Sequence, residues 1–295
     1  MRFFRGNQDY DQMKGLSKTK KILTGIALIL LLLIAGGAMK LYPSFKLFFQ
    51  TEIQQPDKNL TLVLGGGGNS GILVTDKALV VIDTKMGGDA GNLFKLAGEK
   101  AAGKPILVIN THYHGDHVKG NHFYKGSRIY IGNYDKAFLQ KNVDPENMPT
   151  DYVKDSLVLD LGNEIVMLYD LGQAHTTHDM VVYLKNRKML FPGDLVFNHI
   201  NPFLKKESNA DVDKWLAALH VILNKFDLEK VVPGHGAPGG KELIGLMIDY
   251  FGDMKAAEKD PFRAGKLKAK YKDWVEMPMM TSPQATIDYI RETGH

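Results

Sequence analysis

Three histidines and one aspartate lie within six residues of one another in the stretch Thr-His-Tyr-His-Gly-Asp-His at 111–117. This stretch follows a short apolar run at 105–110, which predicts a buried strand because it is brief and is preceded by glycine and proline. Ligands gather at the carboxyl ends of strands in open α/β sheets. Imidazole and carboxylate groups suit zinc and similar divalent metals. We therefore expect a fold that places a metal-binding cluster at a strand end.

The ligand-type residues of this cluster fall into two pairs. His112 and His114 are two apart in an extended loop, so both can point to one side and bind one metal. Asp116 and His117 follow at the predicted start of a helix and face another direction. This division favours two adjacent metals over one. A polar loop with coincidental histidines is the alternative, and the position directly after a strand argues against it.

Other predicted strands also end in polar residues that suit a metal site. Three later strands lead into ligand-type residues, which are His175, Asp194 and His235. Asp83 ends an earlier apolar strand and could support the metal ligands from behind, although a simple turn residue is the alternative. Asn198 and His199 follow Asp194 closely and are candidates for contact with substrate.

Four consecutive glycines occupy 65–68, between two predicted strands. A glycine-rich run can cradle phosphate, but no Lys-Ser or Lys-Thr pair follows and no helical pattern begins there. We therefore interpret the run as a flexible hairpin turn.

The composition excludes several classes of protein. The chain of 295 residues has no cysteine, so disulfides, iron–sulfur clusters and thiolate metal sites are excluded. Residues 1–21 contain six basic and two acidic residues, whereas the rest of the chain has 31 of each. The folded part therefore lacks the basic surface expected of a nucleic-acid-binding protein.

An uncharged, mostly apolar run of 18 residues at 22–39 predicts a single transmembrane helix. Basic residues crowd its N-terminal side, which predicts a cytoplasmic N-terminus and a folded domain in the periplasm or outside the cell. The alternative is a cleaved signal peptide, with small residues at 36–38 near the cleavage point. The long polar segment before the run favours an uncleaved anchor in the cytoplasmic membrane.

The expected organisation has five parts. They are a cytoplasmic segment at 1–21, the anchor at 22–39, a linker at 40–57, the domain that carries the ligand-type residues at 58–252 and a C-terminal, helical extension at 253–295.

Taken together, the ligand-type residues read His-x-His-x-Asp-His, then His, then Asp, then His, each after a predicted strand. This order resembles the metallo-β-lactamase superfamily of hydrolases over roughly residues 58–255. The resemblance implies an α+β fold, the αββα sandwich, in which two sheets pack face to face with helices outside. It also implies a site along one edge of the sandwich, where the strand ends meet.

The resemblance implies two ligand sets joined by one bridging residue. These are His112, His114 and His175 for a first zinc ion, Asp116, His117 and His235 for a second, and Asp194 between them. Two metals about 3.5–4 Å apart can hold a shared hydroxide as the nucleophile. Asp116 could also relay a proton to the leaving group, which makes it the candidate catalytic side chain. Iron or manganese could replace zinc.

Departures from the family patterns narrow the expected reaction. The best-known zinc β-lactamases place a cysteine in the second metal site, and this chain has none. We therefore expect a dinuclear zinc hydrolase that acts on a small ester, thioester, lactone or amide outside the cytoplasm. The alternatives are β-lactamase, phosphodiesterase or sulfatase activity at the same site, or a non-hydrolytic di-iron redox protein.

Overall fold

The computed structural model describes residues 26, 30, 31, 36–39, 41–47, 49–277 and 280–295. The chain divides into two compact units between Pro43 and Ser44, and the strands and helices named below lie in the second. The predicted cytoplasmic segment at 1–21 and most of the predicted membrane span at 22–39 lie outside the described residues. Among the residues that are described, no helix is both long and apolar enough to cross a membrane.

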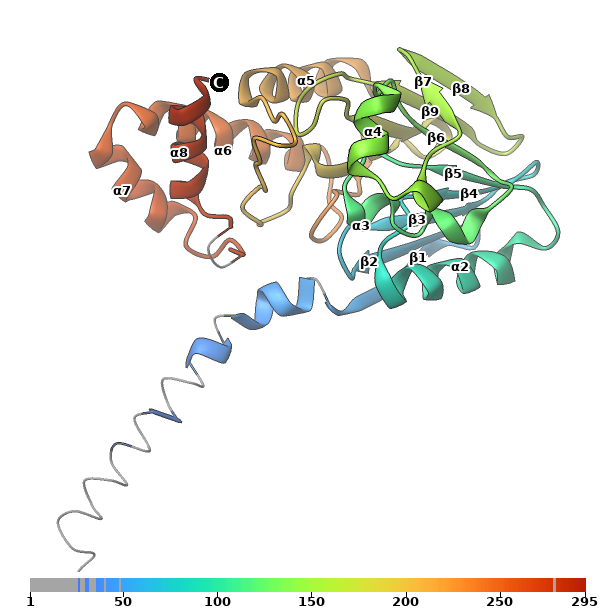
Figure 1. Cartoon of the computed structure of the whole chain (residues 1–295), viewed down its shortest axis with the longest axis horizontal. Helices are drawn as coiled ribbons and strands as arrows, with labels where there is room; N and C mark the ends of the chain where they lie inside the picture. The colour runs from blue at the N-terminus through green and yellow to red at the C-terminus, as the bar shows by residue number, and fades with distance from the viewer. Residues whose placement is uncertain (1–25, 27–29, 32–35, 40, 48, 278–279) are drawn as a thin grey trace, which may run out of the picture. The chain divides into compact units, whose positions relative to one another are not determined.

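Two β-sheets form the centre of the second unit (Figure 1). The larger sheet has seven strands in chain order: β1 (Thr51–Asp57), β2 (Leu60–Gly65), β3 (Ser70–Val74), β4 (Leu79–Ile82), β5 (Ile106–Ile109), β6 (Arg128–Gly132) and β7 (Asp151–Val153). Strands β1 to β4 pair antiparallel, and β4 to β7 pair parallel. The smaller sheet has five strands in the order β12 (Lys230–Val231), β11 (Met189–Phe191), β10 (Met180–Leu184), β9 (Ile165–Asp170) and β8 (Ser156–Asp160).

Side chains alternate between the two faces of each strand, so one set packs between the sheets and the other packs against the helices outside. In β4, Val80 and Ile82 belong to the apolar core between the two sheets, whereas Leu79 and Val81 pack with helix α2 (Gly87–Ala101) on the outer face. This burial on both faces explains why the strand is apolar throughout. On the other side, β10 and β11 pack against helices α5 (Val212–Lys225) and α6 (Glu242–Glu258). The predicted α+β fold with αββα layers is therefore confirmed.

Shorter helices complete the fold. These are α3 (Gly115–Val118) and α4 (Lys136–Asn142), with 3-10 turns at Asn121–Tyr124, Pro145–Asn147, Lys185–Arg187 and Gly193–Leu195.

The C-terminal part, expected to be helical, contains α7 (Pro261–Lys270) and α8 (Pro283–Thr293), which both pack on α6. Each helix begins with an N-cap residue followed by proline. The N-cap side chains, Asp260 and Ser282, accept hydrogen bonds from backbone N–H groups of the first turn.

Strand β1 lies inside the segment at 40–57 that was expected to be a linker. Its sequence, Thr-Glu-Ile-Gln-Gln-Pro-Asp, lacks the apolar alternation of a half-buried strand, and Ile53 is exposed. The strand still pairs with β2 because it closes the edge of the sheet, where Pro56 is tolerated near a register shift. The sandwich therefore begins before residue 58.

Candidate metal centre

Four strand ends from both sheets converge at one edge of the sandwich. The 112–117 stretch follows β5 of the larger sheet, and the other ligand-type residues follow β9, β11 and β12 of the smaller sheet. The structure brings all seven predicted ligands together in two groups: His112, His114, His175 and Asp194, and Asp116, His117 and His235. Within each group, one ligand atom from every residue lies within 4.8 Å of the others.

The first group has the spacing of a tetrahedral metal site. His114 Nδ1 lies 3.0 Å from His112 Nε2 and 3.1 Å from His175 Nε2. Asp194 Oδ2 lies 3.4 Å from His175 Nε2 and 3.8 Å from His112 Nε2. Ligands about 2.0–2.1 Å from a tetrahedral zinc ion are about 3.3 Å from one another. The donor atoms therefore fit a divalent metal of this size.

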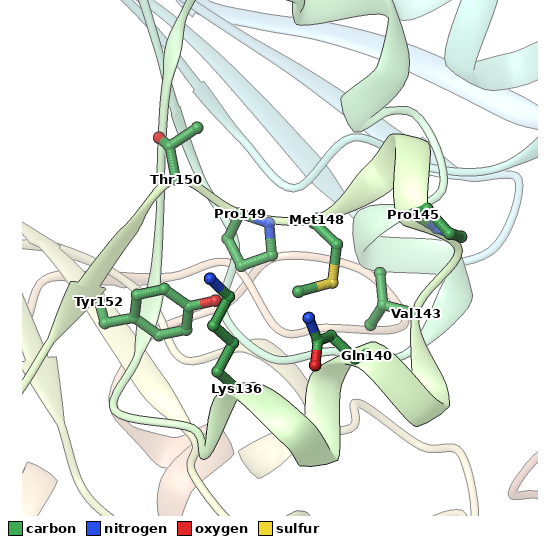
Figure 2. Close-up of a pocket in the computed structure, with 8 residues that line it drawn as sticks. All are labelled: Lys136, Gln140, Val143, Pro145, Met148, Pro149, Thr150 and Tyr152. Carbon is green, nitrogen blue, oxygen red and sulfur yellow. The ribbon is translucent and has the colours of Figure 1, made fainter.

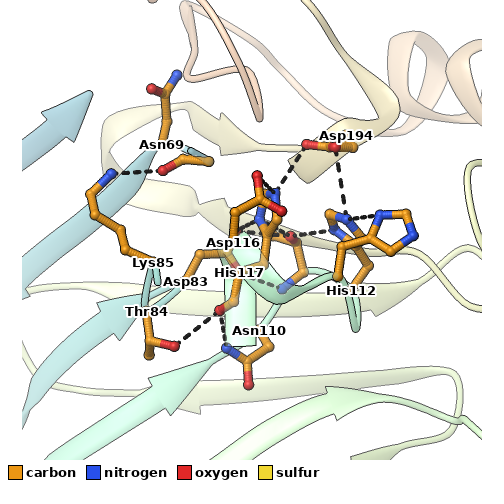
Figure 3. A network of polar contacts seen from close by, with 12 residues as sticks. Asn69, Asp83, Thr84, Lys85, Asn110, His112, Asp116, His117 and Asp194 are labelled. Carbon is orange, nitrogen blue, oxygen red and sulfur yellow. Dashed lines mark hydrogen bonds and ion pairs between the residues drawn. The ribbon is translucent and has the colours of Figure 1, made fainter. Parts of the chain in front are cut away.

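Asp194, a member of the first group, also lies close to the second group (Figure 3). Asp194 Oδ1 lies 3.2 Å from His117 Nε2, and Asp194 Oδ2 lies 3.4 Å from His235 Nε2. Asp116 Oδ2 lies 3.6 Å from His117 Nε2 and 3.3 Å from His235 Nε2. The two oxygens of Asp194 thus face ligand atoms of both groups, which is the position that a bridging carboxylate requires.

The electrostatics of the two groups differ. Burial lowers the pKa of His114 to about 4 and that of His175 to about 3, so both imidazoles are neutral at pH 7 and able to bind a metal. In the second group burial opposes the charged form of His235, but Asp194 and Asp116 outweigh it and raise its pKa to about 9. The second group therefore favours a positive charge, which a metal ion would supply in place of a proton.

Asp83 supports the site from behind the ligands, as the sequence suggested. Its Oδ2 lies 2.8 Å from His117 Nδ1 (Figure 3). Both of its oxygens accept hydrogen bonds from Thr111. Because Nδ1 is held by Asp83, the Nε2 atom of His117 faces the other ligand atoms of the second group. Asp83 itself lies in the left-handed region, with φ 55°, so the chain turns sharply at the end of β4.

Aromatic and hydroxyl groups that no sequence pattern indicated orient the other imidazoles. Ser208 Oγ lies 2.8 Å from His114 Nε2, so the Nδ1 atom of His114 faces the other ligand atoms of the first group. The ring of Phe197 stacks on His235 with centroids 5.3 Å apart, and Trp215 contacts His175 with centroids 5.0 Å apart. Ser208 lies in a loop without any repeating pattern, so no sequence signal marked it.

The glycine run at 65–68 connects antiparallel β2 and β3, as predicted, but it also packs on the candidate metal ligands. A Cβ atom on Gly68 would lie 2.5 Å from Cε1 of His117. The fully buried Lys85 donates hydrogen bonds from Nζ to the carbonyls of Gly65 (2.6 Å) and Gly68 (2.7 Å). Asn69 Nδ2 donates to the carbonyl of Gly236, in the loop of His235 (2.8 Å).

Asn198 and His199 lie near the site without joining either ligand group. Asn198 Nδ2 donates a hydrogen bond to the carbonyl of Ala237 at 2.7 Å, and its backbone N–H donates to the carbonyl of His235. Asn198 therefore braces the loop that carries His235. His199 Nδ1 lies 2.6 Å from Asn198 Oδ1, and its ring lies beside Trp274.

Two cavities differ in their relation to the ligand groups. A cavity of about 580 Å³ lies beside α4, and its lining residues include Lys136, Met148 and Tyr152 but no histidine or acidic residue (Figure 2). A smaller cavity of about 150 Å³ is lined by Asp116, Asp194 and His235 together with apolar side chains. The smaller cavity is therefore the one that opens onto the candidate metal centre.

Comparison with known proteins agrees with this geometry. The family model of the metallo-beta-lactamase superfamily matches residues 63–235. The chain is 29% identical over 181 residues to the metallo-beta-lactamase type 2 of Bacteroides fragilis, an alignment that covers 60% of this chain and 72% of the relative. It is 27% identical over 195 residues to the protein of the same name from Elizabethkingia meningoseptica, covering 65% of this chain and 78% of the relative.

A solved structure shares the fold. The metallo-beta-lactamase from Pontibacter korlensis superposes with a TM-score of 0.61 at 22% identity and covers 69% of this chain and all of its own. The family match spans more than half of the chain and includes every ligand-type residue of the two groups. This chain belongs to the metallo-β-lactamase superfamily and is a metallo-hydrolase.

Proposed function

We propose that this protein is a dinuclear zinc hydrolase that cleaves a small ester, thioester, lactone or amide. The observation that carries the proposal is the position of Asp194. Its Oδ1 faces His117 and its Oδ2 faces His175 and His235, so one carboxylate can serve two metals at once. The absence of cysteine leaves only nitrogen and oxygen ligands, which zinc accepts and which iron and manganese also accept.

The chain would hold one metal with His112, His114 and His175 and the second with Asp116, His117 and His235. The chemistry available from two bound divalent ions is acidification of water toward neutral pH and polarisation of the scissile bond. No separate nucleophilic side chain is then required. Asp83 and Ser208 keep the imidazole rings in the orientation that the ligands need.

Asp116 serves mainly as a ligand in this proposal. Burial opposes its ionised form, but the imidazoles of His117 and His235 outweigh burial and hold the pKa of Asp116 below its ordinary value. A carboxyl group of low pKa is ionised at pH 7 and holds no proton to donate, which favours its role as a ligand. Asp116 also lines the small cavity, where it would take up a proton from water only transiently and pass it on to a leaving group.

The substitution Asp194→Ala tests the bridging role. We expect loss of measurable turnover and a fall from two metals per chain to one or none, with the fold retained. Metal analysis, turnover and circular dichroism check this. Asp160→Ala, which removes an exposed carboxylate far from the ligands in sequence, is the control and should keep both metals. A metal-free protein with full activity would refute the proposal.

A second candidate is β-lactamase activity, favoured by the names of the relatives from Bacteroides and Elizabethkingia. A panel of nitrocefin, a homoserine lactone, a thioester and bis-nitrophenyl phosphate separates the bond types. Preference for nitrocefin would establish β-lactamase activity. Preference for the phosphodiester would refute both candidates and indicate phosphodiesterase activity.

For location, we propose that the run at 22–39 anchors the protein in the cytoplasmic membrane, with the catalytic domain in the periplasm or outside the cell. The support is the sequence alone: 18 uncharged residues after a basic segment. Reporter fusions at the C-terminus should report a location outside the cytoplasm. A cytoplasmic C-terminus would refute the orientation.

A further inference from the structure

We propose that helix α7 docks on an anionic membrane surface and so holds the C-terminal part of the folded domain against the bilayer. This inference rests on the proposed location, in which the run at 22–39 is a membrane anchor, and it does not depend on the proposed reaction. Its support is a local excess of positive charge, an exposed phenylalanine beside it, and a contact that ties this part of the domain to residues next to the anchor.

Positive charge is concentrated around α7. The stretch at 259–272 contains six basic residues and a single acidic one, Asp260, which caps the helix. Residues 22–295 contain 31 basic and 31 acidic residues in all, so the excess belongs to this stretch and not to the domain as a whole. An anionic lipid surface attracts a basic segment of this kind, and each lysine or arginine strengthens the attraction.

The face of α7 that points away from the core suits the same surface. Leu267 is buried in the apolar core to which α6 and α8 also contribute. Phe262 and Lys266 are four residues apart, so they lie on one face of the helix, and both are exposed. Phe262 is 88% exposed, the highest value for a large apolar side chain among the described residues. Helices that lie on a membrane combine basic residues with aromatic side chains that enter the headgroup region.

Ion pairs within the fold leave two lysines of α7 for such a surface. Asp253 of α6 pairs with Lys270 and, at 3.8 Å between Oδ1 and Nη2, with Arg263, so these two cations are balanced inside the domain. Lys266 and Lys268 are exposed, and in the described part of the chain no ion pair involves either of them. Their ammonium groups are therefore available to lipid phosphates.

One hydrogen bond connects this region to the residues next to the anchor. Ser44 is buried, and its Oγ donates a hydrogen bond of 2.6 Å to the carbonyl of Glu276, in the segment that follows α7. The run at 22–39 ends five residues before Ser44, a distance of at most about 18 Å in an extended chain. An anchored chain therefore keeps the segment after α7 within reach of the bilayer. This proximity favours a membrane over a soluble acidic protein as the partner.

A label on α7 tests the docking in the full chain. Because the chain has no cysteine, Phe262→Cys gives a single site for a fluorophore that a nitroxide lipid quenches. The labelled protein is reconstituted into vesicles of phosphatidylcholine, either alone or mixed with phosphatidylglycerol. We expect quenching to be at least about twofold stronger in the anionic vesicles. The difference should disappear in about 1 M salt, where the Debye length is about 3 Å.

A second label serves as the control. Val158 is 55% exposed and belongs to β8, which lies at the opposite end of the second unit from α7 (Figure 1). The label at Val158→Cys should be quenched equally in both kinds of vesicle. Stronger quenching of both labels in anionic vesicles would mean that no particular face of the domain docks, and it would overturn the inference.

Charge reversal tests whether the lysines cause the effect. With the label at position 262, Lys266→Glu together with Lys268→Glu should abolish the stronger quenching in anionic vesicles. Lys58→Glu together with Lys95→Glu changes the net charge equally at two exposed lysines outside α7, so the stronger quenching should remain. Equal loss in both double variants would indicate attraction by the net charge of the whole protein and would overturn the inference.

Flotation of the same vesicles separates this inference from the proposed anchor. A chain that floats with both kinds of vesicle but shows no selective quenching at position 262 would refute the docking and support the anchor. A chain that floats only with anionic vesicles, with quenching at position 262, would support the docking and refute the anchor. A label that responds to polyglutamate in solution but not to anionic vesicles would indicate an acidic protein as the partner, and the inference would be wrong.

Discussion

Asp83 accepts hydrogen bonds from both the backbone and the side chain of Thr111 and also contacts His117 Nδ1. Asn fits the same left-handed backbone conformation, so Asp83→Asn changes the charge with little change in shape. We expect the affinity of the second ligand group for metal to fall about 10–100-fold, as for other residues that orient metal ligands. Competition with a chelator measures this. Asp160→Asn should not alter the affinity, and an unchanged affinity in Asp83→Asn would contradict the supporting role.

Gly68 is required by the close approach of His117. Gly68→Ala would place Cβ 2.5 Å from Cε1 of this ring, so the loop or the ring must move. We expect destabilisation of about 1–3 kcal/mol from overpacking, together with weaker metal binding. Gly98→Ala is the matched control, because Gly98 lies within α2 and a Cβ atom there meets nothing within 4 Å. This control should stabilise the chain by up to about 1 kcal/mol. Urea unfolding measures the stability of the Gly68→Ala and Gly98→Ala variants, and metal titration measures their affinity for metal.

At the scale of elements, the loop between β9 and β10 carries His175 and is fixed by the pair His178 and Asp170. His178 Nδ1 lies 2.8 Å from Asp170 Oδ2, and this contact raises the pKa of His178 above its ordinary value. Asp170 also accepts hydrogen bonds from the backbone N–H groups of Asn133 and Gly172. The pair therefore joins the loops that follow β6 and β9.

The sign of the pH effect follows from the raised pKa. The folded state binds the proton of His178 more tightly than the unfolded state, so the stabilisation is complete below the unfolded pKa of about 6.5 and is lost as pH rises through the folded pKa. We expect wild type to exceed His178→Gln by at most about 1 kcal/mol in unfolding free energy at pH 5.5, because the pair is partly exposed. The difference in unfolding free energy between wild type and His178→Gln should be smaller at pH 9. A difference that grows with pH would refute the assignment.

The elements with a clear apolar pattern were predictable from the sequence. The continuous apolar run at 105–110 and the periodic apolar face of α5 are of this kind, because burial selects their apolar residues. Strand β1 was not predictable, since an edge strand with exposed side chains leaves no apolar alternation. The ligand residues were predictable because each follows a strand. Ser208 and Lys85 were not, because their roles arise from contacts between segments far apart in sequence.

At the scale of the whole molecule, the ligand groups join the two sheets. The 112–117 stretch follows a strand of the larger sheet, and His175, Asp194 and His235 follow strands of the smaller one. A ligand that binds only the folded state stabilises it by about 2.7 kcal/mol at 100 times its Kd. We expect a chelator to lower the Tm by several degrees and added zinc to restore it. Calorimetry with and without chelator measures this, and an unchanged Tm would mean that the sheets do not depend on metal.

Lys85 offers a way to observe the glycine loop directly. Its amine is fully buried, and burial lowers its pKa to about 8, so near that pH much of it is in the deprotonated form that reacts with acylating reagents. Access alone then limits the reaction, because Nζ is enclosed by the carbonyls of Gly65 and Gly68. The rate at which Lys85 is acylated therefore reports how often the loop that covers His117 opens. Mass spectrometry on the intact enzyme measures this rate.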